Sequence, residues 1–305
     1  MLRTWWIASR PFSFPASVMP IVFGTVLAVS VAGARFQPGL ALLSLLAMLI
    51  LHAASNILND VFDYRRGLDR EVFPVSGAVV RKLLTPEQAL RGALILFAVG
   101  SLLGILVAFL STWHILWIGL LGLVVGVGYS PGRLGLKYSA LGDFAVLLNF
   151  GLLGALGAWT VQTGFPSWLP VIWALPMGLL VIGILHANNW RDIAGDKASG
   201  FHSVASLLGD RASLAYYGFL LFCPFILVLL FVFRAGVPES WPGMPVFSLL
   251  CFVALPYAVK LFKKGLKRHA PEHPEDFVGL DGATAGLNIL FGALLTLGFA
   301  QYWLW

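Results

Sequence analysis

The chain has 305 residues, of which 59% are hydrophobic and only 11% are charged, and its mean hydropathy is +0.86. Soluble globular proteins carry about 25% charged residues, so this composition excludes an ordinary soluble enzyme, a disordered chain and a fibrous repeat. The two cysteines, Cys223 and Cys251, both lie in apolar stretches, which leaves no disulfide framework and no zinc site. The composition therefore indicates an integral membrane protein with many spans.

Apolar segments long enough to cross a hydrocarbon layer of about 30 Å recur along the whole chain. They are continuously apolar rather than alternating, which excludes a closed β-barrel. We therefore expect an all-α, polytopic bundle of about nine transmembrane helices, over residues 12–33, 39–60, 87–109, 112–129, 141–162, 168–189, 212–234, 244–262 and 284–304.

The cations fall almost entirely on one side of this predicted bundle. The N-terminus and the loops that follow the second, fourth, sixth and eighth segments carry 17 of the 20 Lys and Arg residues, whereas the opposite side carries only Arg35 and Arg234. Because cytoplasmic loops are enriched in Lys and Arg, the N-terminus and these loops are expected to be cytoplasmic.

The acidic residues lie on the same side of the predicted bundle as the cations, although acidic residues contribute little to membrane orientation. Thirteen of the 14 lie there, and many belong to two clusters. The first cluster ends the second segment, where a continuing helix would place four side chains on one face: Asn56, Asn59, Asp60 and Asp63. Asp69 follows in the loop after Gly67, a residue that suits a helix C-terminus.

The second cluster ends the sixth segment, where Asn188, Asp192 and Asp196 are spaced as a helical ladder with Asn189 and Arg191 beside them. Each cluster ends the second helix of a four-helix unit. This pattern predicts one transmembrane domain with an internal duplication, over about 12–129 and 141–262, plus a final helix, and with both acidic ends facing one cavity.

Carboxylates gathered near a bilayer are costly unless they are paired or functional, and five together repel each other. Oxygen ligands without interleaved His or Cys favour Mg²⁺, which commonly bridges carboxylates and phosphate oxygens. The clusters therefore indicate a phosphate or diphosphate ligand. Each nearby cation taken alone is an ordinary interfacial anchor, but together they suit a diphosphate clamp: Arg10, Arg133, Lys137 and Arg191.

Over nearly its whole length, the chain resembles the UbiA superfamily of intramembrane aromatic prenyltransferases. Within it, the chain is most similar to the 1,4-dihydroxy-2-naphthoate polyprenyltransferases of menaquinone biosynthesis and their vertebrate vitamin-K-forming relative. The resemblance rests on Arg10-Pro-Phe-Ser-Phe-Pro-Ala-Ser-Val-Met-Pro20, Asn56-x-x-Asn59-x-x-x-Asp63-x-x-x-Gly67-x-Asp69, Lys137-Tyr-x-x-Leu-Gly-Asp143, Val161-Gln-Thr-Gly164 and Asn188-Asn-x-Arg-Asp192-x-x-x-Asp196-x-x-x-Gly200. Two stretches depart from the pattern: Phe201 and His202 stand where the family usually has a basic residue, and Pro74-Val-Ser-Gly77 is closer to other branches.

The resemblance implies Mg²⁺-dependent transfer of a polyprenyl group from polyprenyl diphosphate to 1,4-dihydroxy-2-naphthoate with loss of CO₂, in a bacterial or archaeal cell membrane. It implies metal ligation by Asn59, Asp63, Asp69, Asp192 and Asp196. It implies catalytic roles for these four aspartates and Lys137, and substrate contacts from Arg10, Asn56, Asn59, Tyr129, Arg133, Asn188, Asn189 and Arg191. The implied partners are the two substrates and membrane lipid, with no nucleic acid.

Three alternatives stay open. The first is a UbiA-type enzyme for another acceptor, such as 4-hydroxybenzoate or homogentisate. The second is a transporter or cation channel with duplicated helices, which acids at mid-membrane depth would favour. The third is a non-catalytic prenyl-lipid sensor, against which the intact metal positions argue.

The cation asymmetry generates a topology prediction. A cysteine introduced at Ser76 or Ser199 should react with membrane-impermeant thiol reagents only from the cytoplasmic side, because both positions lie in cation-rich loops. Labelling of both positions from outside intact cells would refute the orientation.

Overall fold

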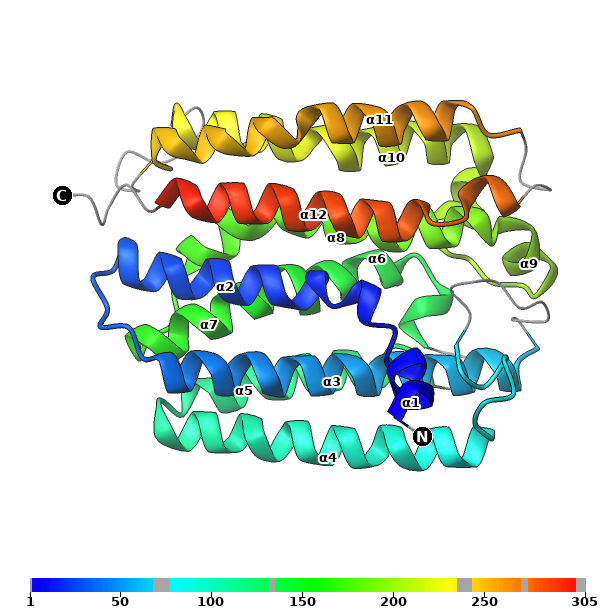
Figure 1. Cartoon of the computed structure of the whole chain (residues 1–305), viewed down its shortest axis with the longest axis horizontal. Coiled ribbons are helices and arrows are strands. Elements are labelled where there is room, and N and C mark those ends of the chain that lie inside the picture. The colour runs from blue at the N-terminus through cyan, green and yellow to red at the C-terminus, as the bar shows by residue number, and fades with distance from the viewer. Residues whose placement is uncertain (1, 68–76, 132–134, 235–242, 270–273, 300–305) are drawn as a thin grey trace.

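The structure is a computed structural model that describes residues 2–67, 77–131, 135–234, 243–269 and 274–299. It is an elongated bundle of roughly parallel and antiparallel helices, with α1 and α9 at the same end (Figure 1). The membrane favours this architecture because a helix satisfies its backbone hydrogen bonds within its own segment. The described part of the chain contains no β-strand, which confirms the expected all-α class.

The helices follow the expected order closely. They are α1 (Leu2–Ser9), α2 (Pro15–Ser30), α3 (Pro38–Arg65), α4 (Pro86–Leu110), α5 (His114–Gly128), α6 (Leu141–Val146), α7 (Leu153–Thr163), α8 (Trp168–Arg191), α9 (Ile193–Ala198), α10 (Val204–Val232), α11 (Leu255–Leu266) and α12 (Leu280–Leu297). Short 3₁₀ helices are η1 (Pro11–Ser13), η2 (Leu136–Tyr138), η4 (Val246–Ala254) and η5 (Pro274–Phe277), and a π-helical turn, η3 (Leu147–Leu152), joins α6 to α7.

Among the described residues, eight helices are long and apolar enough to span a membrane. The ninth expected span is present as the shorter apolar helix α5, His114–Gly128. Helix starts agree with local sequence signals, because Pro15, Pro38 and Pro86 each occupy the first turn, where a missing backbone N–H costs nothing. The prediction of a polytopic bundle is therefore confirmed.

The expected start of the seventh span at residue 212 is wrong. Helix α10 begins at Val204, where the Ser203 hydroxyl caps it by accepting a hydrogen bond from the backbone N–H of Ser206 at 3.2 Å. Gly209 then interrupts the helix, with a left-handed φ of 71°. The charged residues Asp210 and Arg211 follow it, and in the sequence this stretch resembled a loop. The extra turns before Gly209 bring α10 next to the end of the second acidic cluster.

The main core lies between α2, α8, α10 and α12, around large buried side chains such as Phe23, Trp173, Met177 and Phe291. A second buried cluster joins α1, α3 and α4. Helices α2 and α7 approach unusually closely at Gly24, where a Cβ atom would lie 2.3 Å from the backbone oxygen of Ala155. Small residues permit such backbone contact in membranes, where packing rather than the hydrophobic effect holds helices together.

Candidate active site

The first acidic cluster lies on the last turns of α3. Because this helix continues to Arg65, Asn56, Asn59, Asp60 and Asp63 share one helix, and the expected spacing is confirmed. The carboxylates of Asp60 and Asp63 are buried, with 0% and 4% of each residue exposed. Buried carboxylates need charged or hydrogen-bonding partners, and the neighbouring segments supply them.

Lys137 is the principal partner of this cluster. Its Nζ lies 2.5 Å from Asp63 Oδ2 and donates to Asn59 Oδ1 at 2.9 Å. The Tyr138 hydroxyl donates to the other carboxylate oxygen of Asp63 at 3.1 Å, and Ser130 Oγ donates to Asn59 Oδ1 at 3.2 Å. Burial and the Asp63 charge together raise the pKa of Tyr138, which keeps its phenol protonated as a donor. The segment between α5 and α6 thus completes the first motif.

Arg10 approaches the same cluster from the corner between α1 and η1. Its backbone is left-handed, with φ 50° and ψ 61°, and its Nη2 lies 3.8 Å from Asp60 Oδ1. Asn56 supports this corner, because its amide donates to Ser9 O at 2.9 Å and to Ser13 Oγ at 3.0 Å. The structure therefore places Asn56 against the backbone that carries Arg10.

The second cluster differs from its expected geometry. Helix α8 ends at Arg191, Asp192 is its C-cap, and the separate helix α9 begins at Ile193. The predicted continuous ladder of Asn188, Asp192 and Asp196 is therefore wrong. Asp192 has φ −95° and ψ 7°, a conformation that breaks the helix and turns the chain toward α9.

Arg191 organises this second cluster. Its guanidinium donates to both carboxylate oxygens of Asp192, at 2.8 and 2.9 Å, and to Asn188 Oδ1 at 2.7 Å. It also lies 3.9 Å from Asp281 on α12. Planar guanidinium groups suit such bidentate contacts, so Arg191 fixes the direction of Asp192. Asn189 is buried beside this group.

The neighbouring Trp190 is held by a further ion pair. Its indole Nε1 donates to Asp210 Oδ1 at 3.0 Å, and Arg268 donates to the two oxygens of Asp210 at 2.6 and 2.5 Å. Asp210 and Arg268 come from α10 and from the residues after α11, respectively, so this contact ties both elements to the second motif. No local sequence pattern predicts this contact, because these residues are far apart along the chain.

The two clusters lie at the same end of the bundle, because the C-terminal end of α3 and helix α9 are both found there (Figure 1). Asp196 accepts a hydrogen bond from Ser203 Oγ at 2.8 Å. Burial, together with the nearby charges of Asp192 and Asp63, raises the pKa of Asp196 to about 6, against the lowering effects of Ser203 and Lys137. A backbone hydrogen bond of 3.1 Å from His202 N–H to Tyr138 O also joins the two sides.

Two expected site residues, Asp69 and Arg133, lie outside the described residues. Tyr129 is placed near both Asp63 and Asp143, whose charges add to burial in raising the pKa of its phenol. Sequence reasoning did not assign roles to Tyr138 or Ser203, which directly support Asp63 and Asp196. The only available signal was their position next to assigned residues.

The residues present suit a divalent cation by their chemistry. Within the described ranges no three His, Cys, Asp or Glu side chains converge in a metal-binding group, and Asp63 and Asp192 are each paired with a cation. Yet the motif side chains that the structure describes offer carboxylate and amide oxygens, the ligands that Mg²⁺ prefers. In addition, Asp60 Oδ1 is buried without a hydrogen-bond partner, so it retains a free acceptor. We conclude that the donor set fits Mg²⁺.

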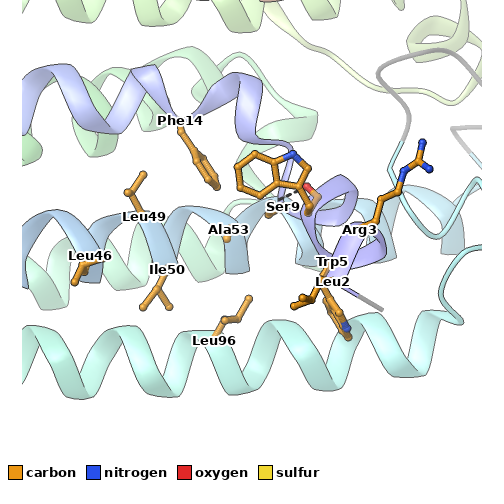
Figure 2. Close-up of a pocket in the computed structure, with 11 residues that line it drawn as sticks. Leu2, Arg3, Trp5, Ser9, Phe14, Leu46, Leu49, Ile50, Ala53 and Leu96 are labelled. Atoms are coloured by element: carbon orange, nitrogen blue, oxygen red, sulfur yellow. Dashed lines mark hydrogen bonds between the residues drawn. The ribbon is translucent and has the colours of Figure 1, made fainter.

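An apolar groove of about 700 Å³ adjoins the Arg10 corner (Figure 2). Trp5 and Leu2 on α1 border it at one end, and Leu46 and Ile50 on α3 and Leu96 on α4 extend it along the bundle (Figure 2). Ser9 and Phe14, which also line the groove, belong to the segment that Asn56 and His52 contact. The groove therefore lies beside the segment that carries Arg10.

Comparison with known proteins identifies the family. The model of the UbiA prenyltransferase family matches residues 17–272, which is most of the chain. The chain belongs to the UbiA prenyltransferase family. It is a membrane prenyltransferase, as the sequence motifs predicted.

Animal proteins are among the relatives of this UbiA-family chain. It is 32% identical over 295 residues to UbiA prenyltransferase domain-containing protein 1 of Danio rerio, covering 96% of this chain and 82% of that protein. It is 33% identical over 297 residues to the Drosophila melanogaster homolog, covering 96% and 78%. These names specify neither 1,4-dihydroxy-2-naphthoate nor menaquinone, and they give no support to the expected bacterial or archaeal membrane.

Solved structures of UbiA homologs share the fold. The apo homolog from Aeropyrum pernix has a TM-score of 0.68 at 18% identity, covering 94% of this chain and 98% of that one. A homolog from Archaeoglobus fulgidus bound to GPP and Mg²⁺ has a TM-score of 0.64 at 16% identity, covering 96% and 99%.

The site geometry generates a prediction about the two motif carboxylates. Asp63→Asn and Asp192→Asn keep the side-chain size but remove the negative charge. That charge pairs with Lys137 at position 63 and with Arg191 at position 192, and it can also ligate a metal cation. If each change weakens stabilisation of the departing charge by about 4 kcal/mol, prenyl transfer slows about a thousandfold. The measurement is the turnover rate of purified, folded variants at saturating substrates and Mg²⁺.

The matched control is Glu87→Gln. Glu87 is an exposed acid near the same end of the bundle, and it lies 4.0 Å from Arg65. Such surface pairs contribute little, so this variant should retain near-normal turnover. Equal activity of all three variants would exclude the two motifs as the catalytic centre.

Proposed function

We propose that this chain transfers a prenyl group from a prenyl diphosphate to an aromatic acceptor in an Mg²⁺-dependent reaction. The observation that carries the proposal is the convergence of the two carboxylate motifs, interleaved with Lys137 and Arg191, at one end of a membrane bundle. Carboxylates isolated on the protein surface would not need these buried basic side chains as partners. A site that contains both carboxylates and basic side chains suits an anionic substrate that binds together with divalent cations.

The cations of the site would bind and orient the diphosphate. Lys137 and Arg191 hold Asp63 and Asp192 in the structure, and Arg10 lies near Asp60. When the diphosphate binds, these cations can share their hydrogen bonds with its oxygens. Bound Mg²⁺ would neutralise the negative charge that develops on the leaving diphosphate, with Asn59, Asp63 and Asp69 on one side and Asp192 and Asp196 on the other.

The reaction begins when the allylic C–O bond breaks and its electron pair leaves with the diphosphate. The positive charge left on the prenyl carbon needs surroundings without water. One turn deeper than Asn56 on α3, His52 packs 4.4 Å from the ring of Phe150 and 5.4 Å from that of Phe14. Aromatic faces of this kind can stabilise a cation while excluding water. Electrons of the acceptor ring then form the new C–C bond, and the attacked ring carbon releases a proton, or CO₂ where it carries a carboxylate, to restore the aromatic ring.

Two hydroxyls hold the His52 ring in this environment. Ser17 Oγ lies 2.6 Å from Nδ1, and Ser13 Oγ lies 3.2 Å from Nε2. Ser13 donates its own proton to Arg10 O at 2.8 Å, so Nε2 must donate to Ser13 and Nδ1 must accept from Ser17. These two contacts hold the His52 ring in place as part of the wall of the chamber.

The prenyl tail would leave the polar site along the apolar groove between α1, α3 and α4 (Figure 2). The groove starts beside Phe14, and aliphatic side chains continue it toward Leu46. Burying each methylene of a tail contributes about 0.8 kcal/mol, so a long apolar groove favours long substrates. This explains why such chemistry is performed within a membrane.

For the aromatic acceptor, the relatives favour a UbiA-type enzyme for another acceptor over 1,4-dihydroxy-2-naphthoate, which only the sequence resemblance supports. For that acceptor the ring carbon bearing the carboxylate would bond to the prenyl carbon, and CO₂ would depart. Other members of the proposed acceptor class are 4-hydroxybenzoate and homogentisate. The cation-rich end that holds the site is proposed to face the cytoplasm.

An acceptor panel tests this proposal. Purified protein with Mg²⁺ and several polyprenyl diphosphates should prenylate at least one of the three aromatic acids, with stoichiometric release of diphosphate. Mass spectrometry of the product identifies the acceptor, and loss of CO₂ marks the naphthoate reaction. Folded protein that prenylates none of them would contradict the proposed aromatic acceptor class.

A further inference from the structure

Arg66 is a cation of the site that sequence reasoning left without a role. It follows the last residue of α3, three positions after Asp63, and its guanidinium carbon lies 3.7 Å from the centre of the Tyr138 ring. The same carbon is 5.5 Å from the centre of the Phe201 ring, and the two rings are 4.6 Å apart. The guanidinium is therefore held by two aromatic side chains from different segments.

This aromatic support connects both acidic motifs. Tyr138 donates its hydroxyl proton to Asp63, and its backbone oxygen accepts from His202 N–H. Phe201 in turn donates its backbone N–H to Asp196 O at 2.9 Å. Arg66 consequently lies where the ends of the first and second motifs meet, and its position depends on contacts to both.

Arg66 also carries an unused hydrogen-bond donor. Its Nη1 is buried and has no hydrogen-bond partner, and the described residues provide Arg66 with no ion pair. Lys137 and Arg191 differ in this respect, since they donate directly to Asp63 and Asp192. A buried donor of a charged group without an acceptor is costly, so a ligand with anionic oxygens would remove that cost.

We propose that Arg66 is a diphosphate-binding residue, held by Tyr138 and Phe201 so that Nη1 donates to an oxygen of the prenyl diphosphate. The inference rests on the proposed function. The two rings stabilise the guanidinium without supplying an anionic partner, which leaves its donors available for the substrate. Because the diphosphate gains negative charge as the C–O bond breaks, Arg66 also stabilises the departing group.

The test compares Arg66→Gln with Arg65→Gln, which removes the same charge from the neighbouring residue. Arg65 is exposed and lies 4.0 Å from Glu87 on α4, away from the aromatic pair. We measure inhibition by inorganic pyrophosphate, KM for the prenyl diphosphate, kcat and thermal unfolding in detergent. Loss of a charge-assisted hydrogen bond should raise the inhibition constant and KM about ten- to a hundredfold in Arg66→Gln. Arg65→Gln should change them by less than about threefold.

Two further variants separate ligand binding from a structural role. Arg66→Lys keeps the charge and should retain more pyrophosphate affinity than Arg66→Gln at equal thermal stability. Phe201→Lys in the Arg66→Gln background places a cation beside the lost guanidinium and should restore part of that affinity. If Arg66→Gln is too unstable to measure, Phe201→Leu, which removes one supporting ring, should raise the pyrophosphate inhibition constant on its own.

Unchanged pyrophosphate inhibition in folded Arg66→Gln, or in the substitute variant Phe201→Leu, would overturn the inference while leaving the proposed function in place. A stability loss without any change in KM or inhibition would overturn it as well, because it would assign Arg66 a structural role. A wild-type protein that neither uses prenyl diphosphates nor binds pyrophosphate would instead overturn the proposed function, and this inference with it.

Discussion

The site depends on the neutralisation of buried negative charge at one end of a membrane bundle. Asp60 and Asp63 are buried, whereas Asp192 and Asp196 are only partly buried, and buried charged carboxylates cost several kcal/mol unless they have partners. Lys137 and Arg191 pair with Asp63 and Asp192 through contacts of 2.5 to 2.9 Å. Removal of Lys137 would leave the buried Asp63 carboxylate without its cationic partner.

This requirement determines how the surrounding elements are arranged. The segment between α5 and α6 must reach α3 to bring Lys137 to Asp63, and α8 ends at Arg191, whose guanidinium holds the carboxylate of Asp192. The early start of α10 supplies Ser203 to Asp196, and the pair of Asp210 and Arg268 holds Trp190 in place. Helices from both halves of the chain therefore meet at one polar centre.

Hydropathy and local spacing predicted much of this arrangement. Long apolar segments can only be helices in a membrane, so the bundle and the order of its spans followed from composition. The spacing from Asn56 to Asp63 also predicted their shared face correctly, because α3 continues through Arg65.

In contrast, the break at Asp192 and the cap at Ser203 depend on tertiary contacts with Arg191 and Asp196. The partnership of Trp190, Asp210 and Arg268 joins residues distant in sequence, so no local pattern could reveal it. The duplicated four-helix organisation stays a prediction.

The central claim is that the two motifs form a divalent-cation site for diphosphate chemistry. The most direct measurement is prenyl transfer by purified protein after treatment with EDTA, with metal removal confirmed by elemental analysis, followed by titration with Mg²⁺. The account predicts that activity is lost in the metal-free protein and returns as Mg²⁺ is added. Full turnover by the verified metal-free protein would contradict it.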